Sequence, residues 1–375
     1  MIYLDNNATT PLDSRVLEAM KPYFSERFGN ASSRPHLFGA EARDAVEAAR
    51  TEAAAVIGAR PDEIVWTSGA TESDNLALKG VFAEGKDHIV TVATEHRAVL
   101  DPCERRERDG FKVTVLGVGP DGSLDLGRLE RAITDRTLLV SVMHANNETG
   151  LLHPLGEIGL ICRSKGALFH TDATQTYGKE ALDVNADAID LLSASAHKFC
   201  GPKGVGLLYV RKRGPRVRCA PMFQGGGHED GLRPGTLNVP GIVGFGAAAA
   251  ICRGEHNEDQ RRIRALRDSL EAGLKSALDG VEVNGDPKRR LANTTNLAFA
   301  GIDADALMKS VPEIAVSSSA ACTSARMQPS YVLGAMGCSE ERIRGSLRFS
   351  LGRFTTAAEI AAAGDAVARA VRHQR

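Results

Sequence analysis

Short apolar segments alternate with helical patterns along most of this chain, and this alternation restricts its fold more than any other feature. The segments at 64–67, 88–93, 111–118, 138–144 and 167–172 are predicted to be strands, and most are followed by a predicted helix. Strand–helix–strand units form parallel sheets with helices on both faces. We therefore predict an α/β fold built on a mostly parallel sheet.

The pattern changes after about residue 258. A charged amphipathic helix is predicted at 259–278, followed by short strands near 281–284, 296–300 and 344–350 and a last helix at 357–372. A chain of 375 residues is long enough for two domains. We predict a large domain of residues 13–258 and a smaller α+β domain formed by residues 1–12 and 259–375.

Composition excludes several classes of protein. The chain is 43% hydrophobic and 25% charged with a formal net charge of −1, so no global field favours nucleic acid or an anionic membrane. Its seven cysteines contain no Cys-x-x-Cys pair, which argues against a disulfide framework or a zinc site and for a reducing compartment. With no signal-peptide pattern and no spanning segment, we expect a cytoplasmic protein without a metal site.

A lysine in a tight loop, Lys198, is the strongest candidate for a catalytic group. It lies between a predicted strand at 188–192 and another at 206–210, and loops at strand ends are where α/β enzymes place chemistry. A lysine in a restricted pocket can lose its proton and act as an amine nucleophile. Lysine holds a carbonyl cofactor such as pyridoxal phosphate as a Schiff base in this way. A solvated loop lysine is the alternative.

Two further polar residues follow predicted strands directly. Asp172 ends one of them, where its carboxylate could pair with a pyridine nitrogen or cap the next helix. His96 follows another, where it could stack on a flat ring, shuttle protons, or serve as a capping or core histidine. One helix and one strand separate Asp172 from Lys198, so both can face one cleft.

The segment 67–73 has the pattern of a strand, a turn of small residues and the start of a helix. Free N–H groups and the helix dipole at such a start favour a phosphate, although Thr71 could simply cap the helix. Asn147 ends a further predicted strand and could equally be a turn asparagine.

A second candidate nucleophile, Cys322, lies in a segment of small residues at 317–325. Such a segment buries little apolar surface, so we expect a mobile loop with an accessible thiol. A structural role is the alternative for any single cysteine. The competing thiol is Cys200, two residues after Lys198, whose place beside a tight turn favours packing.

These residues fall in segments that resemble the group I cysteine desulfurases, which are fold-type I pyridoxal-phosphate enzymes of the class-V aminotransferase kind. The matching segments are YLDNNATTP (3–11), FGNASSRPHLFG (28–39), TSGATESDNLALKG (67–80), TEHRAVL (94–100), NNETG (146–150), HTDATQ (170–175), SAHKFCGPKGVG (195–206), GGGHEDGLRPGT (225–236), SSSAACTSA (317–325) and RFSLGRFTT (348–356). They cover nearly the whole chain in the family's order. The resemblance implies a large domain with a mostly parallel seven-stranded sheet.

The resemblance also implies a role for each candidate. The residues implied in binding pyridoxal 5′-phosphate are Ala70, Thr71, His96, Asn147, Asp172, Gln175, Ser195, His197, Lys198 and Thr236. Among them Thr236 is implied to serve the neighbouring subunit of a homodimer. The residues implied in catalysis are Lys198, Cys322 and His96, and those implied in holding the substrate carboxylate are Asn147 and Arg348.

The implied reaction converts L-cysteine to L-alanine and leaves the sulfur as a persulfide on Cys322. Lys198 removes the α-proton, and the persulfide then passes to a protein acceptor in iron–sulfur cluster assembly, tRNA thiolation or another sulfur modification. Ala196 and Cys200 stand where glycine and tyrosine are common in the family, and neither change removes a catalytic group. An aminotransferase would not need Cys322. Selenocysteine lyase activity and a non-catalytic binding or regulatory homologue remain the alternatives.

Overall fold

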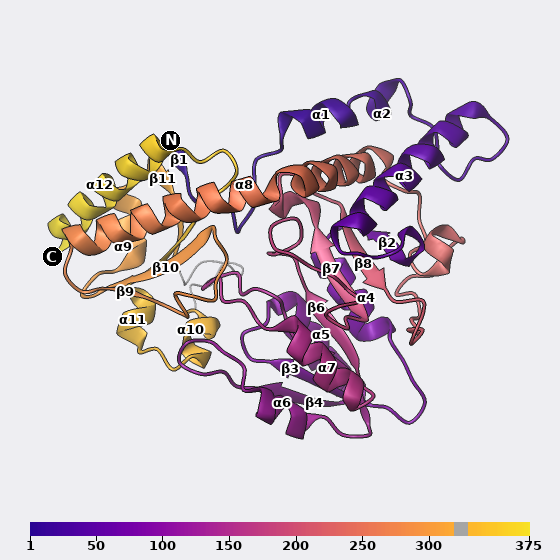
Figure 1. The fold of residues 1–375 in the computed structure, drawn as a ribbon, viewed down its shortest axis with the longest axis horizontal. Coiled ribbons are helices and arrows are strands. Elements are labelled where there is room, and N and C mark those ends of the chain that lie inside the picture. Colours follow the sequence, from indigo (N-terminus) through magenta and orange to yellow (C-terminus); the bar gives the residue numbers. More distant parts are fainter. Residues whose placement is uncertain (319–328) are drawn as a thin grey trace.

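A seven-stranded sheet forms the centre of the computed structural model, which describes residues 1–318 and 329–375 (Figure 1). In spatial order its strands are β2 (Ile64–Thr67), β8 (Gly206–Val210), β7 (Leu191–Ser195), β6 (Leu168–Asp172), β5 (Thr137–Ser141), β3 (His88–Val92) and β4 (Lys112–Leu116). Only β8 runs antiparallel to its neighbours. The prediction of an α/β fold on a mostly parallel seven-stranded sheet is confirmed.

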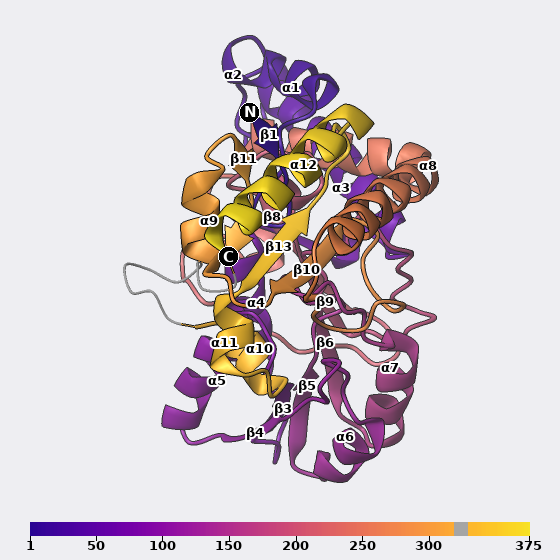
Figure 2. The same cartoon turned by 90° about the vertical axis from the view of Figure 1, so that its left-hand side faces the viewer.

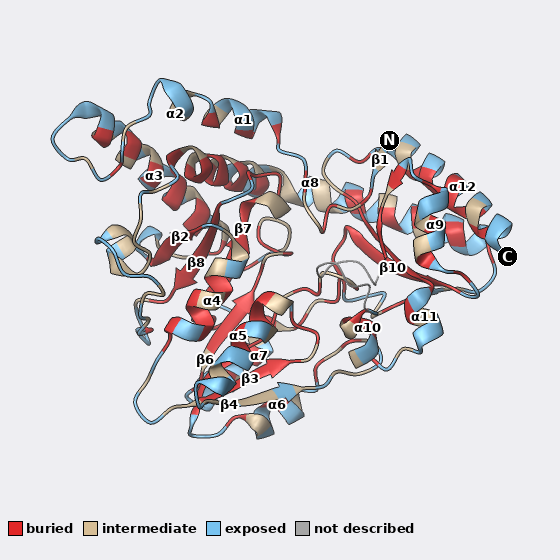
Figure 3. Ribbon diagram, turned by 180° about the vertical axis from the view of Figure 1, so that it is seen from behind, coloured by how far each residue is buried: buried red, intermediate tan, exposed pale blue. Residues whose placement is uncertain are grey.

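Helices cover both faces of this sheet, which explains why successive residues of β3, β5, β7 and β8 are all buried, without alternation between buried and exposed positions. The covering helices are α3 (Leu37–Val56), α4 (Ala70–Gly80), α5 (Arg97–Arg108), α6 (Leu126–Ala132), α7 (Leu155–Ser164) and the first part of α8 (Val239–Ala277). Figure 3 shows the buried strands in red beneath helices whose outer faces are exposed. On one face Trp66, Tyr177 and Phe199 all pack around Phe245 of α8.

A second sheet lies at the left of the molecule in Figure 1 and in front of the central sheet in Figure 2. Its antiparallel strands are β12 (Ser317–Ser318), β13 (Ser346–Ser350), β10 (Thr294–Phe299) and β9 (Val281–Val283), and β1 (Ile2–Tyr3) pairs separately with β11 (Ile314–Ala315). Helices α9 (Ala304–Ser310) and α12 (Ala357–Gln374) and the second part of α8 pack here around a separate hydrophobic core. Shorter helices are α1 (Ser14–Met20), α2 (Pro22–Ser25), α10 (Tyr331–Ala335) and α11 (Glu340–Arg344).

The long helix α8 passes from one core to the other without a break. The sequence pattern predicts only the second part of this helix, at 259–278. The glycine-rich stretch before it is helical because close packing needs its small residues. A Cβ on Gly244 would lie 2.6 Å from Met20 Sδ, and one on Gly246 would lie 2.5 Å from Ala49 Cα. Tertiary contact therefore outweighs the low helix propensity of glycine. The division into domains at residue 258 stays a prediction.

The strand before Lys198 lies further along the chain than expected, at Leu191–Ser195 instead of 188–192. Ala188 adopts a left-handed conformation with φ of +53° and ends a turn in which Ile189 N donates to Val184 O. A residue in that conformation cannot continue a strand. The shift brings the carboxyl end of β7 directly to the short 3₁₀ turn η2 (Ala196–Lys198).

Within the described residues, no helix is long and apolar enough to cross a membrane. The same part of the chain contains no group of three or more His, Cys, Asp or Glu side chains placed to hold a metal ion.

Candidate active site

A cavity of about 590 Å³ opens at the carboxyl ends of the central strands. It brings together residues predicted from six separate segments: Ala70, Thr71, His96, Asn147, Asp172, Gln175, Ser195, His197, Lys198 and Arg348. Two predicted site residues are not part of it. Thr236 is exposed and does not line this cavity, and Cys322 lies outside the described residues.

Lys198 is held by the N-terminal arm of the chain. Its Nζ donates to the backbone oxygens of Asn7 at 2.6 Å and Ala8 at 2.8 Å. Burial lowers the pKa of Lys198 to about 8, and the nearby positive charges of Lys179 and Arg348 act in the same direction. A substantial fraction of this amine is therefore neutral near pH 8, which is the form that can attack a carbonyl or accept a proton.

The loop that carries Lys198 is fixed by Thr10. Thr10 N and Oγ1 both donate to His197 O, and Thr10 Oγ1 accepts from Cys200 N at 2.7 Å. A Cβ on Gly201 would lie 2.8 Å from Ala196 Cβ, so this turn closes only with glycine there. The backbone around Lys198 is therefore fixed by hydrogen bonds to Thr10 and by the close packing of Gly201 against Ala196.

Asp172 and Gln175 present acceptors to the middle of the cavity. Asp172 Oδ1 accepts from Thr174 N at 2.9 Å, an Asx-type turn that leaves its second carboxylate oxygen available. Gln175 Nε2 donates to Asn7 O at 3.0 Å, whereas its Oε1 is buried and has no hydrogen-bond partner among the described residues. A buried acceptor of this kind calls for a donor from a ligand.

His96 both caps a helix and lines the cavity. Its Nδ1 accepts from Ala98 N at 3.1 Å at the start of α5, so the proton of the neutral ring lies on Nε2. Burial lowers the pKa of His96. The capping alternative and the functional one are therefore compatible, because the neutral ring keeps one N–H free of the cap.

A buried polar layer lies beneath Asp172. The ring of His170 bonds to Ser141 Oγ at 2.8 Å and to Ser193 Oγ at 3.0 Å, and burial lowers its pKa to about 4. Asp74 Oδ1 lies 3.6 Å from His170 Nε2. Burial, together with the charge of Asp172, raises the pKa of Asp74 well above its usual range. Asp74 is therefore held in its protonated form, and its side chain and that of Asp172 both line the cavity.

One end of the cavity is suited to a phosphate. Helix α4 begins there at Ala70, and the first N–H groups of a helix have no intrahelical acceptor. A Cβ on Gly206 would lie 2.6 Å from Gly69 Cα, so β8 and this helix start approach too closely for any larger residue. Ser195 lies alongside, and His197 Nδ1 is 3.1 Å from Thr9 Oγ1.

The opposite end carries a guanidinium group. Arg348 of β13 donates through Nη1 to Asn147 O at 2.9 Å and through Nη2 to Asp5 Oδ1 at 2.6 Å and Ser317 Oγ at 3.0 Å. Its Nε and the side-chain oxygen of Asn147 are buried without partners among the described residues. This pairing of an unmatched donor with an unmatched acceptor suits the carboxylate and ammonium groups of an amino acid.

Taken together, these groups fit pyridoxal phosphate. The cavity offers an amine with a depressed pKa, a carboxylate, an orphaned amide oxygen, a neutral imidazole and a helix start spaced around one volume. A ring with a carbonyl, a pyridine nitrogen, a phenolic oxygen and a phosphate has one partner for each.

Several lining groups had no assigned role at the level of sequence. They are Asn7, Asp74, Met143, Lys203 and Gly204. Asn7 acts through its backbone oxygen, which no side-chain pattern can reveal. Asp74 lies on α4 one turn beyond Ala70, so helical spacing from the predicted phosphate site was the available signal.

The model of the aminotransferase class-V family matches residues 2–362. Among curated proteins, the cysteine desulfurase IscS of Anaeromyxobacter sp. (strain Fw109-5) is 56% identical over 362 residues, covering 96% of this chain and 89% of that protein. The cysteine desulfurase IscS of Rickettsia bellii (strain OSU 85-389) is 52% identical, with 96% and 88% covered.

Solved structures give the same result. A NifS-like protein superposes with a TM-score of 0.92 at 38% identity, and 99% of each chain is covered. A protein described as SspA in complex with cysteine superposes with a TM-score of 0.83 at 36% identity, covering 95% of this chain and 100% of that one.

Proposed function

This chain belongs to the aminotransferase class-V family and, within it, to the cysteine desulfurases, and from that premise we propose that its cavity holds pyridoxal 5′-phosphate on Lys198 and takes L-cysteine as substrate. The enzymes of this family depend on pyridoxal phosphate. The solved neighbour described in complex with cysteine supports the choice of substrate.

The observation that carries this proposal is the convergence on Lys198. An amine with a pKa of about 8 shares one cavity with Asp172, the free oxygen of Gln175 and the start of α4. Gln175 Oε1 is buried without a partner among the described residues, and the first N–H groups of α4 have no intrahelical acceptor, so a ligand bound here would satisfy both.

Each residue of the cavity has a role that follows from its position. Pyridoxal phosphate, when bound, supplies a carbonyl and an electron-withdrawing ring. The Lys198 amine takes the proton from the α-carbon of the substrate, while Arg348 and the Nδ2 amide group of Asn147 hold its carboxylate. Asp172 stabilises a proton on the nitrogen that faces it. The helix start at Ala70 and Thr71, with Ser195 and His197, holds the phosphate.

We assign sulfur acceptance to Cys322. The Cβ–S bond of L-cysteine breaks, the sulfur forms a bond to Cys322 Sγ, and the electron pair and a proton remain with the product, L-alanine. The described chain supports this assignment up to Ser318. β12 pairs with β13 in the register Ser317 to Arg348, so the chain enters residues 319–328 beside the guanidinium that lines the cavity.

The described thiols are poor alternatives to Cys322. Burial raises the pKa of Cys200, and it raises the pKa of Cys252 to about 11. A thiol that remains protonated at neutral pH is a weak nucleophile.

We further propose a homodimer in which Thr236 reaches the cavity of a second copy, since it is exposed and does not line its own. The acceptor of the persulfide sulfur is a second protein. The six cysteines of the described residues are free thiols, which supports a reducing, cytoplasmic setting.

The test is a single-turnover experiment with L-cysteine. We expect one alanine per active site and one additional sulfur on the peptide that contains Cys322, located by mass spectrometry under non-reducing conditions. Sulfur on the Cys200 peptide would contradict the assignment. Pyruvate, ammonia and sulfide in place of alanine would contradict the reaction itself.

A further inference from the structure

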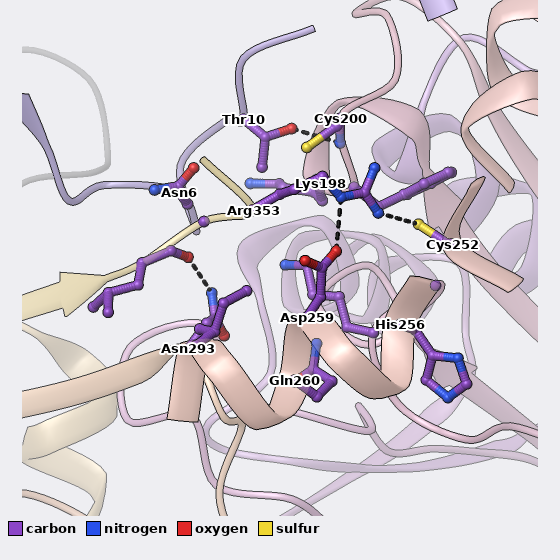
Figure 4. A pocket seen from close by; sticks show the side chains of 16 residues that line it. Asn6, Thr10, Lys198, Cys200, Cys252, His256, Asp259, Gln260, Asn293 and Arg353 are labelled. Carbon is purple, nitrogen blue, oxygen red and sulfur yellow. Dashed lines mark hydrogen bonds and ion pairs between the residues drawn. The ribbon is translucent and has the colours of Figure 1, made fainter. Parts of the chain in front are cut away.

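A second, smaller chamber, which we call the rear chamber, is lined by Lys198 and by residues that do not line the active-site cavity (Figure 4). Its volume is about 40 Å³, enough for one or two water molecules or one small ion. Figure 4 shows Cys200, Cys252 and Arg353 around it, with Asp259 and Gln260 rising from α8 below. Lys198 lines both this chamber and the active-site cavity.

The chamber contains a charge that the protein does not match. Lys179 lines it, and among the described residues its Nζ has no hydrogen-bond partner. Part of this residue reaches the surface, but the nitrogen itself is shielded from solvent. An ammonium group buried without a partner is costly, so a native structure normally supplies one.

Lys198 and Arg353 also line the chamber, and both have partners: Lys198 donates to Asn7 O and Ala8 O, and Arg353 is ion-paired. Arg353 donates to Asp259 Oδ2 at 2.7 Å, to Asp13 Oδ2 at 3.2 Å and to Cys252 Sγ at 3.5 Å. Asp259 also lies 3.4 Å from Arg262 Nη2. These carboxylates are therefore committed to arginines. Glu180, the next residue after Lys179, attracts the Lys179 charge without a hydrogen bond to it, and burial raises the pKa of the Glu180 carboxyl. Lys179 Nζ thus still lacks a hydrogen-bond partner among the described residues.

The walls favour a weakly hydrated ion. Phe199, Ile263 and Leu351 contribute apolar surface, and the two thiols are soft and protonated. A divalent anion such as sulfate would have to give up a much larger hydration energy in so small a space. A monovalent anion of low charge density fits both the volume and the lining.

We propose that this chamber binds one small monovalent anion of the halide and hydrosulfide class, with Lys179 Nζ as its principal ligand. The site is separate from the substrate cavity and touches it only through Lys198. Bound anion would neutralise a positive charge beside that amine, so occupancy of the chamber would strengthen the hold of Lys198 on its proton.

The first test uses bromide, which scatters X-rays anomalously. Crystals of the holoenzyme grown without halide and soaked in sodium bromide should show an anomalous peak within hydrogen-bonding distance of Lys179 Nζ. Crystals of Lys179→Met should lack that peak. A chamber filled only by water in bromide-soaked wild-type crystals would overturn the proposal.

The second test measures thermal unfolding in solution. At constant ionic strength, replacing fluoride by bromide at ten times its dissociation constant should raise the Tm of the wild type by about 2 °C. Lys179→Met should not respond. Lys288→Met, which removes an exposed lysine in a loop, is the matched control and should respond like the wild type. An equal response in Lys179→Met would refute the site.

A parallel titration with sodium hydrosulfide separates the two sources of such an anion. A dissociation constant below that of bromide, again lost in Lys179→Met, would assign the site to the hydrosulfide that is released when an external thiol reduces the persulfide. A higher constant would assign it to halide from the medium. This comparison rests on the proposed desulfurase reaction, whereas the bromide tests do not, so the two can fail independently.

Discussion

Lys198 lines two cavities that differ in the kind of polar atom left without a hydrogen-bond partner. In the active-site cavity the unmatched atoms are mostly neutral, such as Gln175 Oε1 and Asn147 Oδ1. In the rear chamber the unmatched atom is the Nζ of Lys179, which carries a charge. The first arrangement suits a large ligand with several polar atoms, and the second suits a single ion. The difference shows that an orphaned polar group indicates both a site and the kind of ligand it lacks.

The two cavities also differ in how their walls are supported. The active-site cavity is lined from the N-terminal arm, the carboxyl ends of β2, β3, β5, β6 and β7, the start of α4 and β13, and the single atom Asn7 O accepts from both Lys198 and Gln175. The chamber is lined largely by α8, the Lys198 loop and the segment after β13. Substitutions in the first should therefore affect chemistry, and those in the second should affect charge and stability.

The largest expected effect comes from removing the shared residue. Lys198→Ala should lower the rate of alanine formation by at least about 10³-fold, because it removes the amine that moves the α-proton. Borohydride treatment of the wild type should fix pyridoxal phosphate covalently on Lys198, as read by peptide mapping. An adduct on Lys203, which lines the same cavity, would contradict the assignment.

Replacing Cys322 and Cys252 separately by serine tests which region of the protein takes part in sulfur transfer. Cys322→Ser should still bind cofactor and substrate but form no alanine above a trace, since a hydroxyl is a far weaker nucleophile towards sulfur. Cys252→Ser alters only the rear chamber and should stay active. Alanine and sulfide release are the measurements. An inactive but folded and cofactor-loaded Cys252→Ser would show that the rear chamber takes part in sulfur transfer.

A smaller effect is expected at the guanidinium end of the active-site cavity. Arg348→Met should raise KM for L-cysteine by about 10–100-fold, since hydrogen bonds from a charged group to the substrate carboxylate are lost. Arg348 also bonds to Asp5 and Ser317, so Tm must be measured in parallel. Asp5→Asn, which disturbs the same ion pair from outside the cavity, is the control. A similar rise in KM there would indicate a structural role.

The smallest expected effect concerns stability and pH at Lys179. Burial lowers its pKa to about 8, against 10.5 for an ordinary lysine, so between these values the unfolded chain binds more protons than the folded one. The charged group thus destabilises the fold fully below pH 8, and this cost is relieved as pH rises to 10.5. In halide-free buffer Lys179→Met should be more stable than the wild type at pH 7 by up to about 3 kcal/mol.

Denaturant unfolding at several pH values checks this sign. The advantage of Lys179→Met should shrink steadily above pH 8 and should also shrink when bromide is added at pH 7. A constant difference across this pH range would mean that the substitution acts through packing and not through charge.

Much of the fold could be predicted because local patterns of apolar and turn residues indicate its strands and helices. Strands such as Gly206–Val210 and Ile64–Thr67 are short apolar runs with turn residues beside them, and their predicted bounds agree with the structure. The extension of α8 through Gly244 and Gly246 could not be predicted, because those glycines are helical only where Met20 and Ala49 press against them. The Lys198 strand was misplaced because a left-handed alanine at 188 follows from tertiary packing.

The sequence by itself determined the chemistry of this protein: a lysine, an aspartate, a histidine and a small-residue cysteine segment, in an order that identified the family. The tertiary structure sets the hydrogen-bond partners and the pKa values of those groups. It brought the carbonyl oxygens of Asn7 and Ala8 to an amine almost two hundred positions away in the chain, and it lowered the pKa of that amine by burial and by the charge of Lys179. Dielectric environment and distance are properties of packing, and they cannot be read from the order of residue types without the folded structure.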